Sequence, residues 1–300
     1  MRLPERYISS LQRPDFRQNP IRAVAKRIWW KLRWLISNRP WLVTLDNGLR
    51  IATPKSGTGA LIYYLGTSEI ATRDLLNQLV KPGMTVVDVG AHLGEFALRA
   101  ARLTGTKGMV YAFEPQPEIV AFLEHNIQIN SCTNVKAEKV ALGENDGQVE
   151  FEITREPSTS SLAASQPRGT ISRIVVETRS LDSFLQEVKQ TRVDFMKVDV
   201  EGAEFLVFRG AENLLSQPAD DAPVILFEYA PDNYQRFGFE SEEVLQWLES
   251  KGYKLFIIPE AGRILPADSY RHLLDLRHRN LLASKNVERI LDCSVSGDQS

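Results

Sequence analysis

The stretch Met84-Thr-Val-Val-Asp-Val-Gly-Ala-His-Leu-Gly94 is the part of this 300-residue sequence that decides the fold. It opens with a short apolar run rich in β-branched residues, which predicts a buried strand. Gly90 then lets the chain turn tightly, and Gly94 allows a close approach where a helix begins. Glycines at such a turn are sometimes purely structural, so the meaning of this loop depends on the residues around it.

The segments on both sides of this stretch alternate between short apolar strands and amphipathic helices. We expect helices at 69–79, 93–103, 117–130, 181–189, 204–215 and 241–251, and strands at 84–89, 109–113, 135–141, 195–198, 224–228, 254–258 and 280–283. Such a series predicts an α/β fold with a parallel sheet and helices on both faces. Residues 144–181 interrupt the series with a hairpin around a polar loop at 157–170, which is either a lid or a surface loop.

Composition excludes several classes of protein. Cys132 and Cys293 are the only cysteines, too few for a disulfide framework or a cysteine-based zinc site, and they fit a reducing cytosol. Four scattered histidines make no convincing metal cluster. The sequence lacks a stretch of about 18 apolar residues that would predict a spanning helix, and its first residues do not resemble a secretory signal.

The charge is distributed unevenly along the chain. Residues 1–40 contain ten basic and two acidic residues and carry +8, so the remaining 260 residues carry −10 within a total of −2. A body at −10 is a poor candidate for binding nucleic acid over a broad surface. The basic segment ends in a predicted amphipathic helix, Ile21 to Ile36, and residues 41–65 predict short strands joined by turns.

The helix at 21–36 has an apolar face bordered by cations. The apolar face holds Ile21, Val24, Ala25, Ile28, Trp29, Leu32, Leu35 and Ile36. Trp30 and Trp34 fall on the basic side, next to Lys31 and Arg33. Aromatic rings among cations suit the interface of an anionic membrane, where such a helix lies flat. The alternative is packing on the acidic body or on a second subunit.

Ligands of open α/β sheets bind at the carboxyl ends of the strands, so the residues that follow each strand are candidates for a binding site. Gly90 and Gly94 follow the first strand without the G-x-G-x-x-G spacing of dinucleotide binders. Glu114 follows the second strand, where an acid accepts hydrogen bonds from the vicinal hydroxyls of a ribose, and Pro115 comes next. After the third strand, Ala141 could line a flat slot for adenine.

Acidic residues gather after the fourth and fifth strands. The run Lys197-Val-Asp199-Val-Glu201-Gly-Ala-Glu204 follows the fourth strand, and Glu228 ends the fifth. Acids also favour helix starts for simple dipole reasons. Asp199 and Glu228 should nevertheless stand side by side above adjacent strands, where two acids can share a proton, act as general base or hold a hard cation.

These motifs, in this order, resemble the FkbM family of S-adenosylmethionine-dependent methyltransferases. The resemblance runs from about Leu45 to Ala283, and the Lys-x-Asp-x-Glu-Gly-x-Glu string is its specific part, because the glycine loop is common to class I methyltransferases. It implies a Rossmann-like, seven-stranded, mostly parallel sheet whose last strand is antiparallel. It also implies methyl transfer to a hydroxyl oxygen of a glycan or secondary metabolite. His92 departs from the Asn that is frequent at that loop position.

The resemblance assigns roles to individual residues. The cofactor S-adenosylmethionine would be held by Asp88, Gly90, Ala91, His92, Gly94, Glu114, Pro115 and Ala141. Catalysis would fall to Asp199, Glu201 and Glu228, with Glu204 also on the acceptor side and a divalent cation as an optional addition. Two other classes stay open: a catalytically inactive, methyltransferase-like binding domain, and a nicotinamide-dependent oxidoreductase, which the missing third glycine disfavours.

The sequence therefore predicts four regions. These are a basic arm with an amphipathic helix at 1–40, a cap of strands at 41–68, a methyltransferase domain at 69–286 and a polar, frayed tail at 287–300. The expected partner is a small-molecule or glycan acceptor rather than nucleic acid. We expect a cytoplasmic protein, with peripheral contact to the inner membrane face through residues 20–37 as a further possibility.

Overall fold

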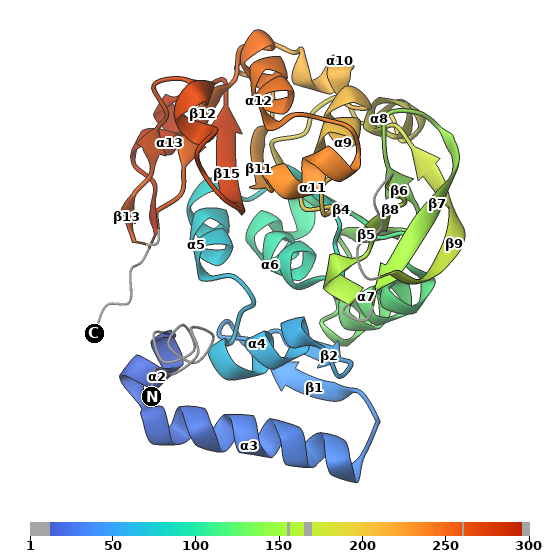
Figure 1. Cartoon of the computed structure of the whole chain (residues 1–300), viewed down its shortest axis with the longest axis vertical. Coiled ribbons are helices and arrows are strands. Elements are labelled where there is room, and N and C mark those ends of the chain that lie inside the picture. The colour runs from blue at the N-terminus through green and yellow to red at the C-terminus, as the bar shows by residue number, and fades with distance from the viewer. Residues whose placement is uncertain (1–12, 155–156, 165–169, 260, 296–300) are drawn as a thin grey trace.

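An eight-stranded sheet runs through the centre of the protein, which we describe from a computed structural model covering residues 13–154, 157–164, 170–259 and 261–295 (Figure 1). Its strands are β3 (Thr85–Val89), β4 (Met109–Phe113), β5 (Val135–Glu138), β10 (Phe195–Val198), β11 (Val224–Tyr229), β12 (Lys254–Ile257), β14 (Leu265–Pro266) and β15 (Arg279–Ser284). Their order is β14-β12-β15-β11-β10-β3-β4-β5. β15 is antiparallel to both neighbours, while β3, β4, β5, β10 and β11 are parallel. This confirms the expected Rossmann-like sheet, to which β14 adds a two-residue edge strand.

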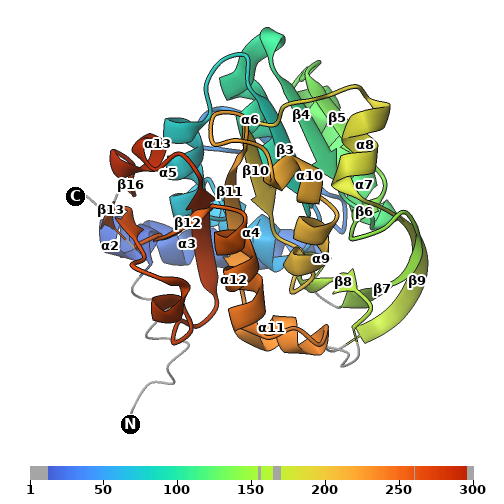
Figure 2. The ribbon, with the colours of Figure 1, turned by 90° about the horizontal axis from the view of Figure 1, so that it is seen from above.

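Helices cover both faces of this sheet, as Figure 2 shows from above. One face carries α5 (Ile70–Leu79), α6 (Glu95–Thr104), α7 (Pro117–Ile129) and α13 (Glu288–Leu291), and the other α8 (Leu181–Glu187), α9 (Glu204–Arg209), α10 (Glu212–Leu215), α11 (Pro231–Arg236) and α12 (Ser241–Ser250). Successive strand residues alternate between the two cores. Val87 and Val89 pack toward α8 and α9, whereas Val86 packs toward α5 and α6. Three short 3₁₀ turns complete the helices: η1 (Gly105–Lys107), η2 (Pro157–Thr159) and η3 (Tyr270–Leu273).

A smaller sheet stands beside the end of the main one. Its strands are β6 (Ala141–Leu142), β7 (Gly147–Thr154), β8 (Ser161–Leu162) and β9 (Thr170–Arg179). β7 and β9 form the expected antiparallel hairpin. The single strand expected at 135–141 is wrong, because the chain leaves the main sheet after Glu138 and β6 pairs with β9 instead. Part of the loop predicted at 157–170 falls at residues 165–169, outside the described residues.

The N-terminal unit, residues 13–65, holds α2 (Pro14–Gln18), α3 (Pro20–Ile36), β1 (Trp41–Thr44), β2 (Arg50–Thr53) and α4 (Gly57–Leu65). β1 and β2 form the expected hairpin. The expectation of strands and turns up to residue 65 is wrong, since 57–65 is helical. The Ser56 hydroxyl caps this helix by accepting a hydrogen bond from the Gly59 amide at 3.0 Å, and the chain leaves it at Gly66 with φ +78°.

The amphipathic helix α3 attaches to the body by the side that carries Trp30 and Trp34. Trp30 and Trp34 are buried, whereas most of the apolar face, from Ile21 to Ile36, is exposed. Trp30 stacks on Trp41 and on Tyr63, with ring centroids 5.4 and 5.6 Å apart. The membrane role assigned to Trp30 and Trp34 is therefore wrong: these rings fix the helix to β1 and α4.

The segment after residue 286 is ordered against the body up to residue 295, which corrects the expected frayed tail. Ile290, Cys293 and Val295 are buried, and β16 (Ser294–Val295) pairs with β13 (Gly262–Arg263). The Gln78 side chain of α5 accepts from the Ser294 amide at 2.9 Å and donates to its carbonyl at 2.6 Å. A few apolar residues at the right spacing thus hold a mostly polar segment in place. In the described part of the chain, every helix is too short or too polar to cross a bilayer.

Candidate active site

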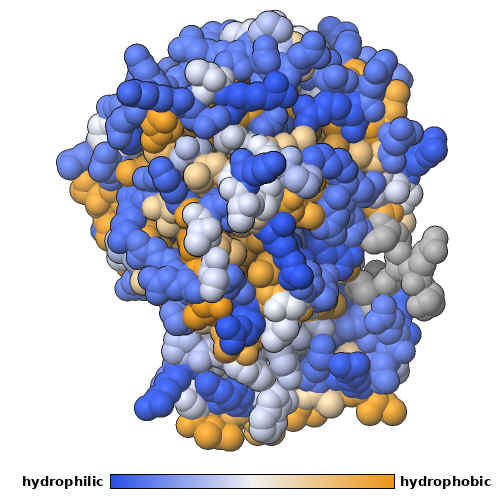
Figure 3. Space-filling view, turned by 180° about the vertical axis from the view of Figure 1, so that it is seen from behind, coloured by the Kyte–Doolittle hydropathy of each residue, from blue (hydrophilic) through white to orange (hydrophobic). Residues whose placement is uncertain are grey.

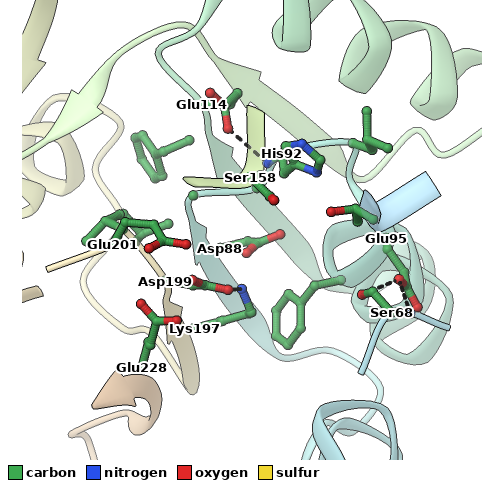
Figure 4. Close-up of a pocket in the computed structure, with 18 of the residues that line it drawn as sticks. Ser68, Asp88, His92, Glu95, Glu114, Ser158, Lys197, Asp199, Glu201 and Glu228 are labelled. Carbon is green, nitrogen blue, oxygen red and sulfur yellow. Dashed lines mark hydrogen bonds and ion pairs between the residues drawn. The ribbon is translucent and has the colours of Figure 1, made fainter. Parts of the chain in front are cut away.

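A cavity of about 300 Å³ lies at the carboxyl ends of β3, β4, β10 and β11. It is closed from the sides by residues of α4, α5, β6 and β8. In Figure 4 the carboxylates of Asp88, Asp199 and Glu228 gather on one side of this cavity, while Ser68 and Glu95 lie on the other. The topology accounts for the gathering, because parallel strands end at the same edge of the sheet.

The loop after β3 is shaped by a close approach to β10. Gly90 has φ +80°, and a Cβ at this position would lie 1.9 Å from the Asp199 carbonyl oxygen, so only glycine fits. The Gly90 and Ala91 amides donate to the Phe113 carbonyl at 3.0 and 2.9 Å. Gly94 does not line the cavity: a Cβ there would meet the Leu123 side chain at 2.5 Å. Its place is structural, at the contact between the loop and α7.

Glu114, Pro115 and Ala141 line the cavity as the sequence predicts. The Glu114 carboxylate is buried and accepts the amides of His92 and Gln116, both at 3.0 Å. Burial raises the pKa of Glu114 to about 7, although these two amides oppose the shift. Each oxygen keeps a lone pair for a ligand, because each accepts a single backbone hydrogen bond.

His92 brings two polar groups to the site, its backbone amide and its ring. It adopts φ +49°, a left-handed conformation that turns its amide toward Glu114. Burial lowers the pKa of His92 to about 4, so the imidazole is neutral at physiological pH. Its Nε2 has no hydrogen-bond partner among the described residues, which leaves this atom for a ligand.

Asp88 is fully buried at the end of β3. Neither of its carboxylate oxygens has a hydrogen-bond partner of ordinary geometry within the described residues. Burial raises the pKa of Asp88 to about 7, and the charge of Lys197 limits the rise. An unsatisfied carboxylate in this position is costly without a ligand, which marks it as a binding group.

Lys197 lies between two carboxylates, and the sequence interpretation gave it no role. Its ammonium group donates to Asp199 at 2.7 Å. Burial alone would lower the pKa of Lys197, but Asp199, Asp88 and Glu69 together hold it above its ordinary value. The lysine therefore stays charged and fixes the orientation of Asp199.

Asp199 and Glu228 stand side by side, as expected, because Val198 pairs with Phe227 in the parallel register. Oε1 of Glu228 lies 2.5 Å from Nε2 of His278, and its Oε2 has no partner among the described residues. Burial raises the pKa of Glu228, against the hydrogen bond of His278, and the Asp199 charge raises it further. His278 was missed, since it precedes β15 by one residue and belongs to no motif.

The other two acids of the β10–α9 loop differ in role. Glu201 lines the cavity, has φ +56° and accepts a hydrogen bond from the Asn233 side chain at 3.2 Å. Glu204 was expected on the acceptor side, and the structure corrects this. It lies beneath the loop, fully buried, and accepts the amides of Val200 at 3.0 Å and Gly202 at 3.3 Å. Glu204 therefore shapes the loop that presents Asp199 and Glu201.

Sequence reasoning also missed the wall between α4 and α6. Glu95 accepts hydrogen bonds from the Thr67 hydroxyl at 2.6 Å and from the amide and hydroxyl of Ser68 at 2.9 and 2.7 Å. An acid in the first turn of a helix is usual, so nothing in the sequence distinguishes Glu95 from a dipole-stabilising residue. Within the described residues, the structure shows no group of three or more His, Cys, Asp or Glu arranged to hold a metal ion.

The strand order and the buried acids at the ends of β3 and β4 define a class I methyltransferase fold. The chain belongs to the FkbM methyltransferase family: the model described as "Methyltransferase FkbM domain" matches residues 88–255, more than half of the chain. The cofactor of this family is S-adenosylmethionine, and the site fits it. Glu114 keeps lone pairs that could accept from hydroxyl groups. The carboxylate of Asp88, which has no partner among the described residues, and the acids beyond it provide negative charge for a cationic sulfonium.

Curated relatives agree with this family. Methyltransferase 1 of Beauveria bassiana is 27% identical over 57% of this chain and 73% of its own length. The 2-O-methyltransferase NoeI of Sinorhizobium fredii is 26% identical over 48% and 64%, and the hexuronic acid methyltransferase AglP of Haloferax volcanii is 29% identical over 43% and 50%. The chain thus spans less than two thirds of the last two. A solved O-methyltransferase from Thermotoga maritima aligns at TM-score 0.39 and 14% identity, over 82% of this chain and 78% of that one.

Proposed function

We propose that this protein transfers the methyl group of S-adenosylmethionine to a hydroxyl oxygen of a carbohydrate or another small polyhydroxylated acceptor. The observation that carries the proposal is Oε2 of Glu228, which has no hydrogen-bond partner among the described residues and lies beside Asp199. A hydroxyl acceptor needs a base to remove its proton, and a buried carboxylate with a raised pKa is a suitable one. The name of NoeI gives methyl transfer to an oxygen in that relative, and the name of AglP gives a hexuronic acid as the acceptor of the other.

The cofactor supplies an electrophilic methyl group when it is bound, and the protein does the rest by placement. Glu114, the Gly90 loop and the ring nitrogen of His92 would hold the nucleoside half. Asp88 would face the cationic half. With the methyl donor fixed, the acceptor oxygen must be brought in line behind the methyl group and water excluded, which is the main source of rate in such transfers.

The acids of the β10 and β11 ends would handle the acceptor. Glu228 takes the hydroxyl proton on Oε2, while His278 holds Oε1 and so fixes the rotation of the carboxylate. Asp199 is oriented by Lys197 and accepts a hydrogen bond from the acceptor. Glu201 binds a neighbouring hydroxyl from the other side of the same loop. In this proposal the basic arm, residues 1–40, takes no part in the chemistry.

The first test is cofactor binding measured by calorimetry. We expect Asp88→Asn and Glu114→Gln each to weaken S-adenosylmethionine binding by about tenfold or more, because each removes a buried charge-assisted contact. Glu118→Gln, an exposed acid on α7, is the matched control and should bind like the unaltered chain. Thermal stabilisation by S-adenosylmethionine but not by NAD separates this function from the oxidoreductase alternative. Unchanged binding in both variants would contradict the site.

The second test identifies the acceptor atom. Purified enzyme is given cofactor with a labelled methyl group and a panel of neutral and acidic oligosaccharides. Transfer to a hydroxyl gives a methyl ether, which survives mild alkali, whereas transfer to a carboxylate of a uronic acid gives an ester that alkali removes. Alkali-stable label supports the proposal. Alkali-labile label contradicts it, and absence of transfer with intact cofactor binding favours the inactive binding domain.

A further inference from the structure

The outward face of α3 is an apolar surface that nothing in the described structure covers. We define the outward face as Ile21, Val24, Ile28, Trp29, Leu32, Leu35 and Ile36. Their exposed fractions run from 45% to 81%. Figure 1 shows α3 along the lower edge of the molecule, and in Figure 3 apolar side chains line that edge below a hydrophilic band. Single exposed apolar residues are ordinary, but seven on one helix face mark an interaction site.

The helix cannot turn this face inward without breaking its anchor. Trp30 stacks on both Trp41 and Tyr63, and the Lys26 ammonium donates to the Tyr64 carbonyl at 2.9 Å. Arg27 pairs with Asp15 at 2.5 Å. Rotation of the helix would expose two buried tryptophans and break both polar contacts. The body therefore holds the outward face toward solvent.

The chemistry around the outward face identifies what it binds. The helix contains five cations and no acid. Around the helix axis, at 100° per residue, Val24 and Trp29 stand at the two edges of the outward face. Lys31 lies just beyond Val24 and Arg22 lies just beyond Trp29, so a cation flanks each edge. Arg22 and Lys31 are both exposed. An apolar strip between two cationic edges matches a bilayer whose headgroups are anionic and whose acyl chains lie below them.

We propose that the protein docks peripherally on anionic lipid membranes, with α3 lying flat in the interface and its outward face among the acyl chains. A second copy of the chain is a poorer occupant: packing two outward faces together brings the same cationic edges of both copies side by side. The lipid surface satisfies both the apolar strip and the cations. Trp29, which is half exposed at the edge of the strip, would sit at headgroup level.

Docking would also place the active site next to the membrane. α4 packs against α3 on one side, through Tyr63 and Tyr64, and lines the cavity on the other, through Thr58, Leu61 and Ile62. One helix layer therefore separates α3 from the cavity. Figure 1 shows α4 directly above α3. This placement does not depend on what the cavity methylates.

Vesicle flotation of the full chain tests the proposal. Vesicles of phosphatidylcholine alone are compared with vesicles containing roughly one-third phosphatidylglycerol, an anionic lipid. We expect binding to the anionic vesicles, at least about tenfold weaker binding to the neutral ones, and a loss of binding at high salt. On anionic vesicles, the emission of Trp29 shifts to the blue and is quenched by brominated lipid, a signal that Trp29→Phe removes.

Matched variants keep the test falsifiable. Ile28→Gln with Leu35→Gln removes two residues of the outward face and should weaken vesicle binding about tenfold or more. Ile171→Gln with Val175→Gln removes two residues of similar exposure on β9 and should bind like the unaltered chain. All four positions are exposed, so the variants fold. If the unaltered chain stays with the buffer, or both double variants float equally well, the proposal is overturned. A dimer that only the first variant breaks, without flotation, assigns the face to a second copy and also overturns it.

Discussion

Glu228 combines features that a base requires. It is buried enough for its pKa to rise, one oxygen is held by His278, and the other has no partner in the described part of the chain. A base with a raised pKa is matched to proton transfer near neutral pH. Asp199, beside it, accepts a hydrogen bond from Lys197, which fixes the position of the Asp199 carboxylate. The two acids at neighbouring strand ends thus differ in their hydrogen-bond partners, Lys197 for Asp199 and His278 for Glu228.

Replacing Glu228 tests its role directly. We expect Glu228→Gln to lower kcat by about 10²–10⁴-fold, the usual contribution of a general base, while S-adenosylmethionine binding stays within about twofold. Steady-state kinetics with the best acceptor and calorimetry of the cofactor measure the two quantities. A variant that keeps its kcat would remove Glu228 from the mechanism.

His278 should set the pH range of activity without touching the acceptor. Its hydrogen bond lowers the pKa of Glu228, so His278→Asn should let that pKa rise and shift the acid limb of the kcat/KM profile to higher pH. The shift follows because Glu228 must be deprotonated to act. His272→Asn replaces a histidine of equal exposure elsewhere on the surface and should leave the profile unchanged. Two superimposable profiles would show that His278 does not position the base.

At the scale of elements, Asn126 joins three pieces of backbone. Its side chain lies fully buried on α7, accepts from the Ala52 amide of β2 at 2.7 Å, and donates to the carbonyls of Ala52 and Leu93 at 3.2 and 2.9 Å. One amide group thus fixes the β1–β2 hairpin and the glycine loop on the same helix. The N-terminal unit is thereby attached by buried polar contacts as well as by aromatic packing.

Removing the side-chain amide of Asn126 should destabilise the protein. Asn126→Ala leaves the Ala52 amide and the Leu93 carbonyl buried without partners, so we expect the free energy of unfolding to fall by about 2–4 kcal/mol. Chemical denaturation followed by circular dichroism measures it. Asn213→Ala, at an exposed position of α10, is the control and should change stability by less than about 0.5 kcal/mol. A loss below 1 kcal/mol for Asn126→Ala would mean that water replaces the amide there.

For the whole molecule, the buried acids make stability depend on pH in an unusual sense. The pKa values of Asp88 and Glu114 are raised to about 7 by burial, above their values in an unfolded chain. The folded protein therefore binds more protons than the unfolded one between about pH 4 and pH 7. The stability from these two groups is fully present below pH 4 and is lost as pH rises through 7. A carboxyl whose pKa is lowered on folding gives the opposite trend.

Asp88→Asn should remove part of this dependence. A rise in the pKa of Asp88 from its ordinary value to about 7 corresponds to a destabilisation on the order of 4 kcal/mol at pH 8 in the cofactor-free protein. We expect the variant to be more stable than the unaltered chain at pH 8 and nearly equal to it at pH 4. Unfolding in urea at the two pH values measures this. Lys197 keeps Asp199 as its partner in the variant. An equal difference in stability between the two proteins at both pH values would contradict the raised pKa of Asp88.

The main sheet was predictable because each strand and helix carries its own pattern, and the strand ends then placed Asp88, Glu114, Asp199 and Glu228 together. The features that were not predicted depend on contacts between distant segments. The orientation of α3 could not be predicted. Hydrophobicity alone favours packing the apolar face on the body, but that face is exposed because Trp30 stacks on Trp41 and Tyr63 instead. His278 and Glu95 reach the site from segments whose local sequence is ordinary.

The aromatic anchor of α3 has an optical consequence. Of the five tryptophans in the chain, Trp29, Trp30, Trp34 and Trp41 lie in the N-terminal unit, and Trp247 alone lies in the methyltransferase body. The intrinsic fluorescence of this protein is therefore mainly a signal from the N-terminal unit, whereas most of its helices and strands, which give the far-ultraviolet dichroism, lie in the body. A melting curve recorded by emission therefore reports mainly on the surroundings of α3, and one recorded by dichroism reports on the helices and strands of the whole protein.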